Sequence, residues 1–252
     1  MHYEIYNTKY HKKQYTNKIQ VEAFIISLDE SLIYIHIMLK MYNTLRLSIF
    51  IQVITGIIET LTLLIKVPPR IILLQQMMLL EVIVQFIEGS FYLYWFYNFT
   101  KITNITPSRY ADWVITTPTM LVNLICYYIF LQNKNLTFGK IWKQEWKTII
   151  PILCLNWLML LFGYLGETKV LPILTSVFLG FIPFLMYFYI IYKKYVSVDS
   201  SLFYYFFIFW ALYGVAATFP YTMKNNWYNI LDLFAKNFFG IYLTYLIARN
   251  FF

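Results

Sequence analysis

Apolar stretches of about 20 residues follow one another through most of this chain, and short polar connections join them. A helix of that length rises about 30 Å, which matches the hydrocarbon core of a bilayer. Charged residues make up 13% of the sequence, compared with about 25% in soluble domains. The chain is therefore predicted to be an all-α integral membrane protein. We count seven spans, at residues 44–66, 73–97, 108–132, 148–166, 170–192, 201–221 and 227–249.

The segment before the first span differs from the rest of the chain. Residues 1–43 begin with a polar, basic tail that lacks the apolar stretch of a signal peptide, so an internal helix is expected to direct insertion. Charges such as Glu22, Asp29 and Glu30 interrupt the apolar residues that follow. We interpret them as an amphipathic surface helix, with a spanning helix as the alternative. Residues 44–252 form the predicted seven-transmembrane domain.

Lysine and arginine are distributed unequally between the two sets of connections. The first, third and fifth carry Lys66, Arg70, Lys134, Lys140, Lys143, Lys147, Lys193 and Lys194, and the others carry Lys101, Lys169 and Lys224. Because basic loops stay in the cytoplasm, this predicts an N-terminus outside and a cytoplasmic C-terminus, although lysines of the N-terminal tail disagree. The net charge of +8 largely reflects this asymmetry, and no nucleic-acid partner is expected.

A lysine lies within the last apolar stretch. A charged amine at membrane depth costs a few kcal/mol or more, so Lys236 is a candidate functional residue. Asp232 precedes it by four residues, which places both side chains on one helix face. Two interpretations stay open. The pair locks the helix bundle as a buried ion pair, or the desolvated amine is poised to form a Schiff base with an aldehyde.

The third span carries a second group of polar residues. Arg109, Asp112 and Thr116 are spaced three and four residues apart and share one helix face. With the pair in the seventh span, the bundle would contain two cations and two carboxylates, a balance that a dry interior requires. Such a set predicts an internal charge network.

These motifs together resemble the microbial rhodopsins. The third span reads RYADW followed by TTP, the seventh contains DxxxK, and Trp210 and Tyr213 match aromatic residues of the sixth span. The resemblance implies all-trans retinal bound to Lys236 as a protonated Schiff base, with Asp112 as the counter-ion. It also implies a pocket built from Asp232, Thr116, Thr117, Trp113, Met120, Trp210 and Tyr213, with Arg109 outside the two carboxylates. Gly214 and Ala217 depart from the family pattern, in which proline and tryptophan, respectively, are common at these positions.

The first two spans each contain a polar stripe with the spacing i, i+4, i+7 and i+11. The first stripe is Ser48, Gln52, Thr55 and Glu59, and the second is Glu81, Gln85, Glu88 and Tyr92. Carboxylates are costly in lipid, so the stripes should face each other or water. A water-filled cleft for cations is one interpretation, and hydrogen bonding between helices is the alternative.

The second resemblance is to the channelrhodopsins. Ser48, Glu88 and Asn237 match the residues of their central gate, and the motifs TGIIE, KVPPR and ExxxQxxE resemble the short viral rhodopsins of giant algal viruses. Asn123 replaces the carboxylic acid that outward pumps carry in the third span. The resemblance implies a light-gated cation channel, with an outward proton pump as the alternative and monovalent cations or protons as the transported ions. The membrane would be that of a host cell if the chain is viral. No enzymatic activity or metal is expected, and a homo-oligomer is left open.

Overall fold

The computed structural model describes residues 40–197 and 199–251. Residues 1–39, which include most of the predicted polar tail and amphipathic helix, lie outside the described residues. The chain divides into the units Met1–Met41 and Tyr42–Phe252, and the second contains almost all of the described residues.

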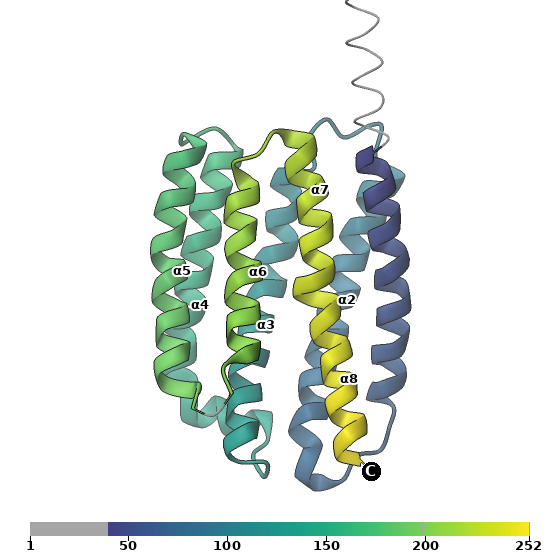
Figure 1. Cartoon of the computed structure of the whole chain (residues 1–252), viewed down its shortest axis with the longest axis vertical. Coiled ribbons are helices and arrows are strands. Elements are labelled where there is room, and N and C mark those ends of the chain that lie inside the picture. The colour runs from purple at the N-terminus through teal and green to yellow at the C-terminus, as the bar shows by residue number, and fades with distance from the viewer. Residues whose placement is uncertain (1–39, 198, 252) are drawn as a thin grey trace, which may run out of the picture. The chain divides into compact units, whose positions relative to one another are not determined.

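The unit is a bundle of seven helical rods that run alternately in opposite directions (Figure 1). The described part of the first helix is Lys40–Leu63, and the other elements are η1 Pro69–Ile71, α2 Ile72–Tyr97, α3 Thr106–Gln132, α4 Phe138–Glu167, α5 Ile173–Tyr195, α6 Ser201–Ala217, α7 Tyr221–Asp232, η2 Leu233–Asn237 and α8 Phe238–Phe251. The last three elements are consecutive and form the seventh rod. The predicted all-α seven-helix fold is confirmed.

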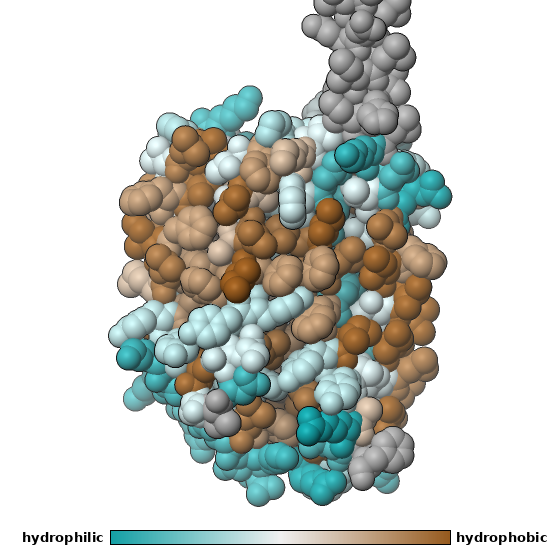
Figure 2. Space-filling view, viewed as in Figure 1, coloured by the Kyte–Doolittle hydropathy of each residue, from teal (hydrophilic) through white to brown (hydrophobic). Residues whose placement is uncertain are grey.

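Six of the described helices are long and apolar enough to cross a membrane. The sixth rod, Ser201–Ala217, is apolar but has 17 residues, which gives about 26 Å. Apolar residues cover much of the upper and middle part of the visible face, and hydrophilic residues gather at its lower end and at the upper right (Figure 2). The protein is therefore an integral, multi-pass membrane protein.

The fourth helix begins ten residues earlier than predicted, at Phe138 instead of 148. Its first turns contain Lys140, Lys143 and Lys147, which the sequence pattern assigned to a loop. A hydropathy window detects only the part of a helix that lies in the hydrocarbon core, so a helix that continues into the polar layer is shortened by the prediction. The seventh rod likewise begins at Tyr221 rather than at 227.

Two features of the bundle position the site. α3 is the central helix, since 72% of its apolar window is buried, compared with 28% for the first helix and 33% for α4 and α5. The seventh rod is interrupted by η2, a turn of π-helix that carries Lys236. Such turns occur mostly as single insertions in α-helices and are frequent at functional sites.

Candidate functional site

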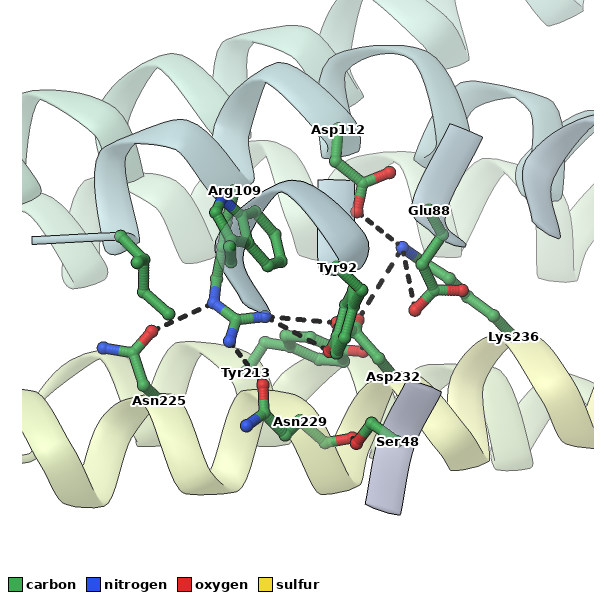
Figure 3. Close-up of polar contacts among 12 residues, drawn as sticks. Ser48, Glu88, Tyr92, Arg109, Asp112, Tyr213, Asn225, Asn229, Asp232 and Lys236 are labelled. Carbon is green, nitrogen blue, oxygen red and sulfur yellow. Dashed lines mark hydrogen bonds and ion pairs between the residues drawn. The ribbon is translucent and has the colours of Figure 1, made fainter. Parts of the chain in front are cut away.

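Lys236 is buried at the centre of the bundle and faces three carboxylates (Figure 3). Its Nζ lies 2.8 Å from Asp112 Oδ2, 3.6 Å from Glu88 Oε1 and 3.8 Å from Asp232 Oδ1. α3, α2 and α7 each contribute one of them. The spacing of Asp232 and Lys236 correctly predicted that they share a face, whereas the closest partner comes from α3.

Asp232 is held by two tyrosines and an arginine. The hydroxyls of Tyr92 and Tyr213 donate hydrogen bonds of 2.6 and 2.7 Å to its two carboxylate oxygens. Arg109 Nη1 lies 3.4 Å from Asp232 Oδ2, and both side chains are fully buried. Every Asp232 oxygen therefore has a partner besides Lys236, whereas Asp112 Oδ1 is buried without a hydrogen-bond partner in the described structure.

Arg109 is enclosed by neutral groups on its other sides. Its Nε donates to Asn225 Oδ1 at 3.0 Å, and Nη2 donates to Asn229 Oδ1. Its guanidinium carbon lies 4.6 Å from the ring centre of Trp95 and 5.6 Å from that of Tyr228. Aromatic faces and amide oxygens stabilise a buried guanidinium without adding negative charge.

The network contains one carboxylate more than the sequence balance predicted. Lys236 and Arg109 are matched by Glu88, Asp112 and Asp232, because the α2 stripe reaches Lys236. Two cations against three carboxylates leave one excess negative charge, which a dry interior disfavours unless one carboxyl carries a proton.

An apolar pocket extends from Lys236 between α3, α4, α5 and α6. Its lining includes Thr117, Trp113, Met120, Trp210, Tyr213, Asp232 and Lys236, as well as Gly214 and Ala217. A Cβ added at Gly214 would lie 2.8 Å from the ring of Phe181, so an aromatic side chain occupies the space that the glycine leaves. The pocket is therefore a mostly apolar slot that includes aromatic side chains, and Lys236 and Asp232 contribute polar groups to its wall.

Buried polar side chains continue from Lys236 along the first helix, α2 and the seventh rod. Gln52 donates to Glu88 at 3.2 Å and Gln85 donates to Glu59 at 3.4 Å. Asn237 donates to Gln85 at 3.3 Å. The two stripes predicted from the sequence therefore face each other across the bundle.

The model of the family described as bacteriorhodopsin-like proteins matches residues 41–250. The chain belongs to this family of microbial rhodopsins. A search of curated proteins gave no match.

Solved structures agree with the assignment. The rhodopsin is similar to viral rhodopsin OLPVRII, with 30% identity, a TM-score of 0.74, and coverage of 84% of this chain and 99% of that one. Xanthorhodopsin, described as a light-driven ion pump with a dual chromophore, has 20% identity and a TM-score of 0.66, with 85% and 94% covered. The rhodopsin from Rubrobacter xylanophilus has 16% identity and a TM-score of 0.65, with 82% and 96% covered. The last two similarities concern the fold.

The family implies a retinal chromophore, and the residues of this rhodopsin fit it. The slot has aromatic side chains that suit a rigid polyene, and among the described residues that line it Lys236 supplies the one amine. The unpartnered Asp112 Oδ1 and the nearby carboxylates provide the negative surroundings that keep a nitrogen at this position charged.

Thr116 donates to the main-chain carbonyl of Asp112 at 3.0 Å, because a threonine hydroxyl one turn later on a helix reaches that oxygen most easily. The gate that the resemblance implied differs in this rhodopsin. No hydrogen bond joins the predicted gate residues Ser48, Glu88 and Asn237 directly in the described structure; Ser48 donates to the main-chain oxygen of Asn229 at 3.1 Å. Each gate residue instead forms a hydrogen bond with another neighbour: Ser48 with Asn229, Glu88 with Gln52, and Asn237 with Gln85.

Several functional positions were missed by the sequence reasoning. Asn225 and Asn229 precede Asp232 and Lys236 with the same i, i+4, i+7, i+11 spacing that revealed the other stripes, so a signal was present. Asn156 of α4 had no such signal. It is buried and donates to Thr117 at 2.8 Å beside the slot.

Proposed function

We propose that this rhodopsin is a light-gated cation channel that holds all-trans retinal on Lys236. The observation that carries the proposal is a set of polar side chains, linked by hydrogen bonds between helices, that retain buried oxygens without hydrogen-bond partners among the described residues. These oxygens are Gln52 Oε1, Glu59 Oε2, Glu81 Oε1, Glu88 Oε2, Asn123 Oδ1 and Asn237 Oδ1. Buried acceptors are normally satisfied, so a set of this kind favours a path for water and cations.

Retinal would supply absorption of visible light and a change of shape at Lys236. Asp112 is the best-placed acceptor for a proton from the Lys236 nitrogen, since it is the closest carboxylate and retains a free oxygen. Both oxygens of Asp232 already accept hydrogen bonds from Tyr92 and Tyr213, so Asp232 is the poorer proton acceptor. The first proton movement is therefore assigned to the Lys236–Asp112 pair.

Glu88 couples that event to the polar path. Its carboxylate lies 3.6 Å from Lys236 Nζ and accepts a hydrogen bond from Gln52 of the first helix. Loss of the positive charge at Lys236 would remove an attraction that holds Glu88 in place, so its contact with the first helix would loosen. Glu81, Gln85 and Glu59 continue the path beyond this point.

Arg109 closes the other half of the path in the resting structure. It is fully buried and is held by Asn225 and Asn229, while Ser48 ties the first helix to the same turn of α7. A cation in a narrow path repels other cations, so conduction would require Arg109 to move or become better screened.

An outward proton pump is the second candidate, since the Lys236–Asp112 pair would serve both functions. At the position of the internal proton donor, however, Asn123 donates hydrogen bonds of 3.2 Å to Glu81 Oε2 and to the main chain of Met77. An amide does not release a proton at neutral pH, so it positions Glu81 instead of supplying protons.

Photocurrent measured against voltage separates the two functions. We expect the current of cells that express the full chain with retinal to reverse sign near the equilibrium potential of the permeant cation. The reversal potential should move when external sodium is replaced by a large organic cation. A current that stays outward at all voltages would refute the channel and support the pump.

A further inference from the structure

The first ten residues of α4 extend beyond the hydrocarbon core. α4 has 30 residues, or about 45 Å, against about 30 Å for the core of a bilayer. Charges gather at its start, over residues 138–147, while residues 149–165 are uncharged. The first three turns therefore lie in the layer of lipid headgroups.

This segment presents lysines and tryptophans on its outer face. Lys140, Lys143 and Lys147 have the spacing i, i+3, i+7, and all three are exposed. Trp142 and Trp146 are four residues apart on the adjoining strip and are 38% and 48% exposed. Lys147 Nζ lies 5.9 Å from the ring centre of Trp146. The inner face, with Ile141 and Ile149, is buried in the bundle.

The end of α5 and the adjoining connections enlarge the basic area. Six lysines lie in residues 134–147 and 193–199, against two carboxylates, Glu145 and Asp199, which leaves a net charge of +4. Glu145 pairs with Lys194 at 2.7 Å, and Asp199 accepts two hydrogen bonds from Ser201. The lysines of α4 thus face solvent without a carboxylate partner in the described structure.

We propose that this area, the α4 basic collar (Lys140, Trp142, Lys143, Trp146 and Lys147), binds the phosphate headgroups of anionic lipids. Three ammonium groups complement a phosphate diester, and the tryptophans lie where their rings bridge headgroups and acyl chains. A lipid is favoured over an acidic protein because the tryptophan strip continues without a break into the exposed apolar residues Ile150 and Trp157.

The test compares two double variants of the full chain purified with retinal. Phosphatidylglycerol is titrated into the detergent-solubilised protein, and bound lipids are counted by native mass spectrometry. Lys143→Gln with Lys147→Gln should weaken the tightest phosphatidylglycerol binding about tenfold. Lys66→Gln with Arg249→Gln removes the same charge from exposed positions at the same end of the bundle, in the first connection and in α8, and should leave that binding unchanged.

A further variant and a neutral lipid distinguish a specific lipid-binding site from a general effect of charge. Lys143→Arg with Lys147→Arg should retain binding, and phosphatidylcholine should bind equally to all variants. Circular dichroism confirms that each variant has kept its helices. Equal losses in the two glutamine doubles, or equal affinity for the anionic and neutral lipids in the unmodified protein, would overturn the proposal.

Discussion

At the scale of single residues, the position of Lys236 among three carboxylates determines what its neighbours can do. Asp112 is closest and has a free oxygen, Asp232 is saturated by tyrosine and arginine, and Glu88 connects to the polar stripes. The three carboxylates are chemically similar, but their different hydrogen-bond partners predict a different role for each. The division predicts distinct spectra for substitutions at these positions.

Lys236→Ala should abolish the visible absorption band that forms with all-trans retinal, since no other amine lines the slot in the described structure. Lys224→Met is the matched control. Lys224 is also buried in the seventh rod, but its ammonium is bound by Glu167 at 2.6 Å. The measurement is an absorption spectrum of purified protein. A band that survives in Lys236→Ala would refute the retinal assignment.

Asp112→Asn should shift the band to longer wavelength, because a neutral amide stabilises the charge at the Lys236 nitrogen less than a carboxylate does. Glu88→Gln also removes a carboxylate near this nitrogen, since Glu88 Oε1 lies 3.6 Å from Lys236 Nζ. If Glu88 is ionised at rest, a smaller shift in the same direction follows, since the interaction falls with distance.

The two spectra also test the assignment of the counter-ion. A spectrum unaffected by Asp112→Asn would make Asp232 the dominant partner. A spectrum unaffected by Glu88→Gln would indicate that Glu88 is the carboxyl that carries the proton in the resting state, and its role in the path would then be tested by the photocurrent.

At the scale of elements, the sequence was informative about faces and less so about ends and partners. The 3.6-residue period placed Gln52, Glu59, Gln85 and Glu88 on the buried sides of their helices, as observed. Periodicity fixes only the direction of a side chain. It does not specify which neighbour the side chain meets, so the bond from Ser48 to the main chain of Asn229 and the turn of π-helix at Lys236 could not be predicted.

Close packing between the first helix and the seventh rod gives an element-scale prediction. A Cβ at Gly240 would collide with the carboxylate of Glu59, so Gly240→Ala should displace Glu59 and destabilise the fold by about 1–3 kcal/mol. Gly56→Ala and Gly89→Ala are matched controls, because a Cβ at either position meets nothing within 4 Å. Alanine there should be neutral or stabilising by up to about 1 kcal/mol.

Thermal unfolding followed by helical circular dichroism measures these differences, and photocurrents report on the path. Gly240→Ala should alter current amplitude or selectivity more than it alters the absorption band. Equal melting temperatures for Gly240→Ala and the two controls would show that Glu59 can move aside without cost.

At the scale of the whole molecule, the bundle has an apolar half and a polar half that meet at Lys236. The slot for retinal lies between α3 and the helices that follow it, whereas the polar stripes lie on the first helix, α2 and the seventh rod. Lys236 belongs to both, because it ends the slot and contacts Glu88 of the stripes. A structural change caused by light absorption in one half would be transmitted to the other half through Lys236.

The charge asymmetry of the bundle predicts its orientation in the membrane. Lys66, Arg70, the lysines of the α4 basic collar, Lys193 and Lys194 lie at the end of the bundle that also carries Arg249 and the C-terminus (Figure 1). Basic residues close to membrane helices remain in the cytoplasm, so the C-terminus should be cytoplasmic and the N-terminus outside. An antibody against an N-terminal tag should label intact cells, and one against a C-terminal tag should require permeabilisation.

The five lysines at positions 9, 12, 13, 18 and 40 favour the opposite arrangement. Labelling of a C-terminal tag on intact cells would show that this tail outweighs the loops, and would place Arg109 on the cytoplasmic side of Lys236.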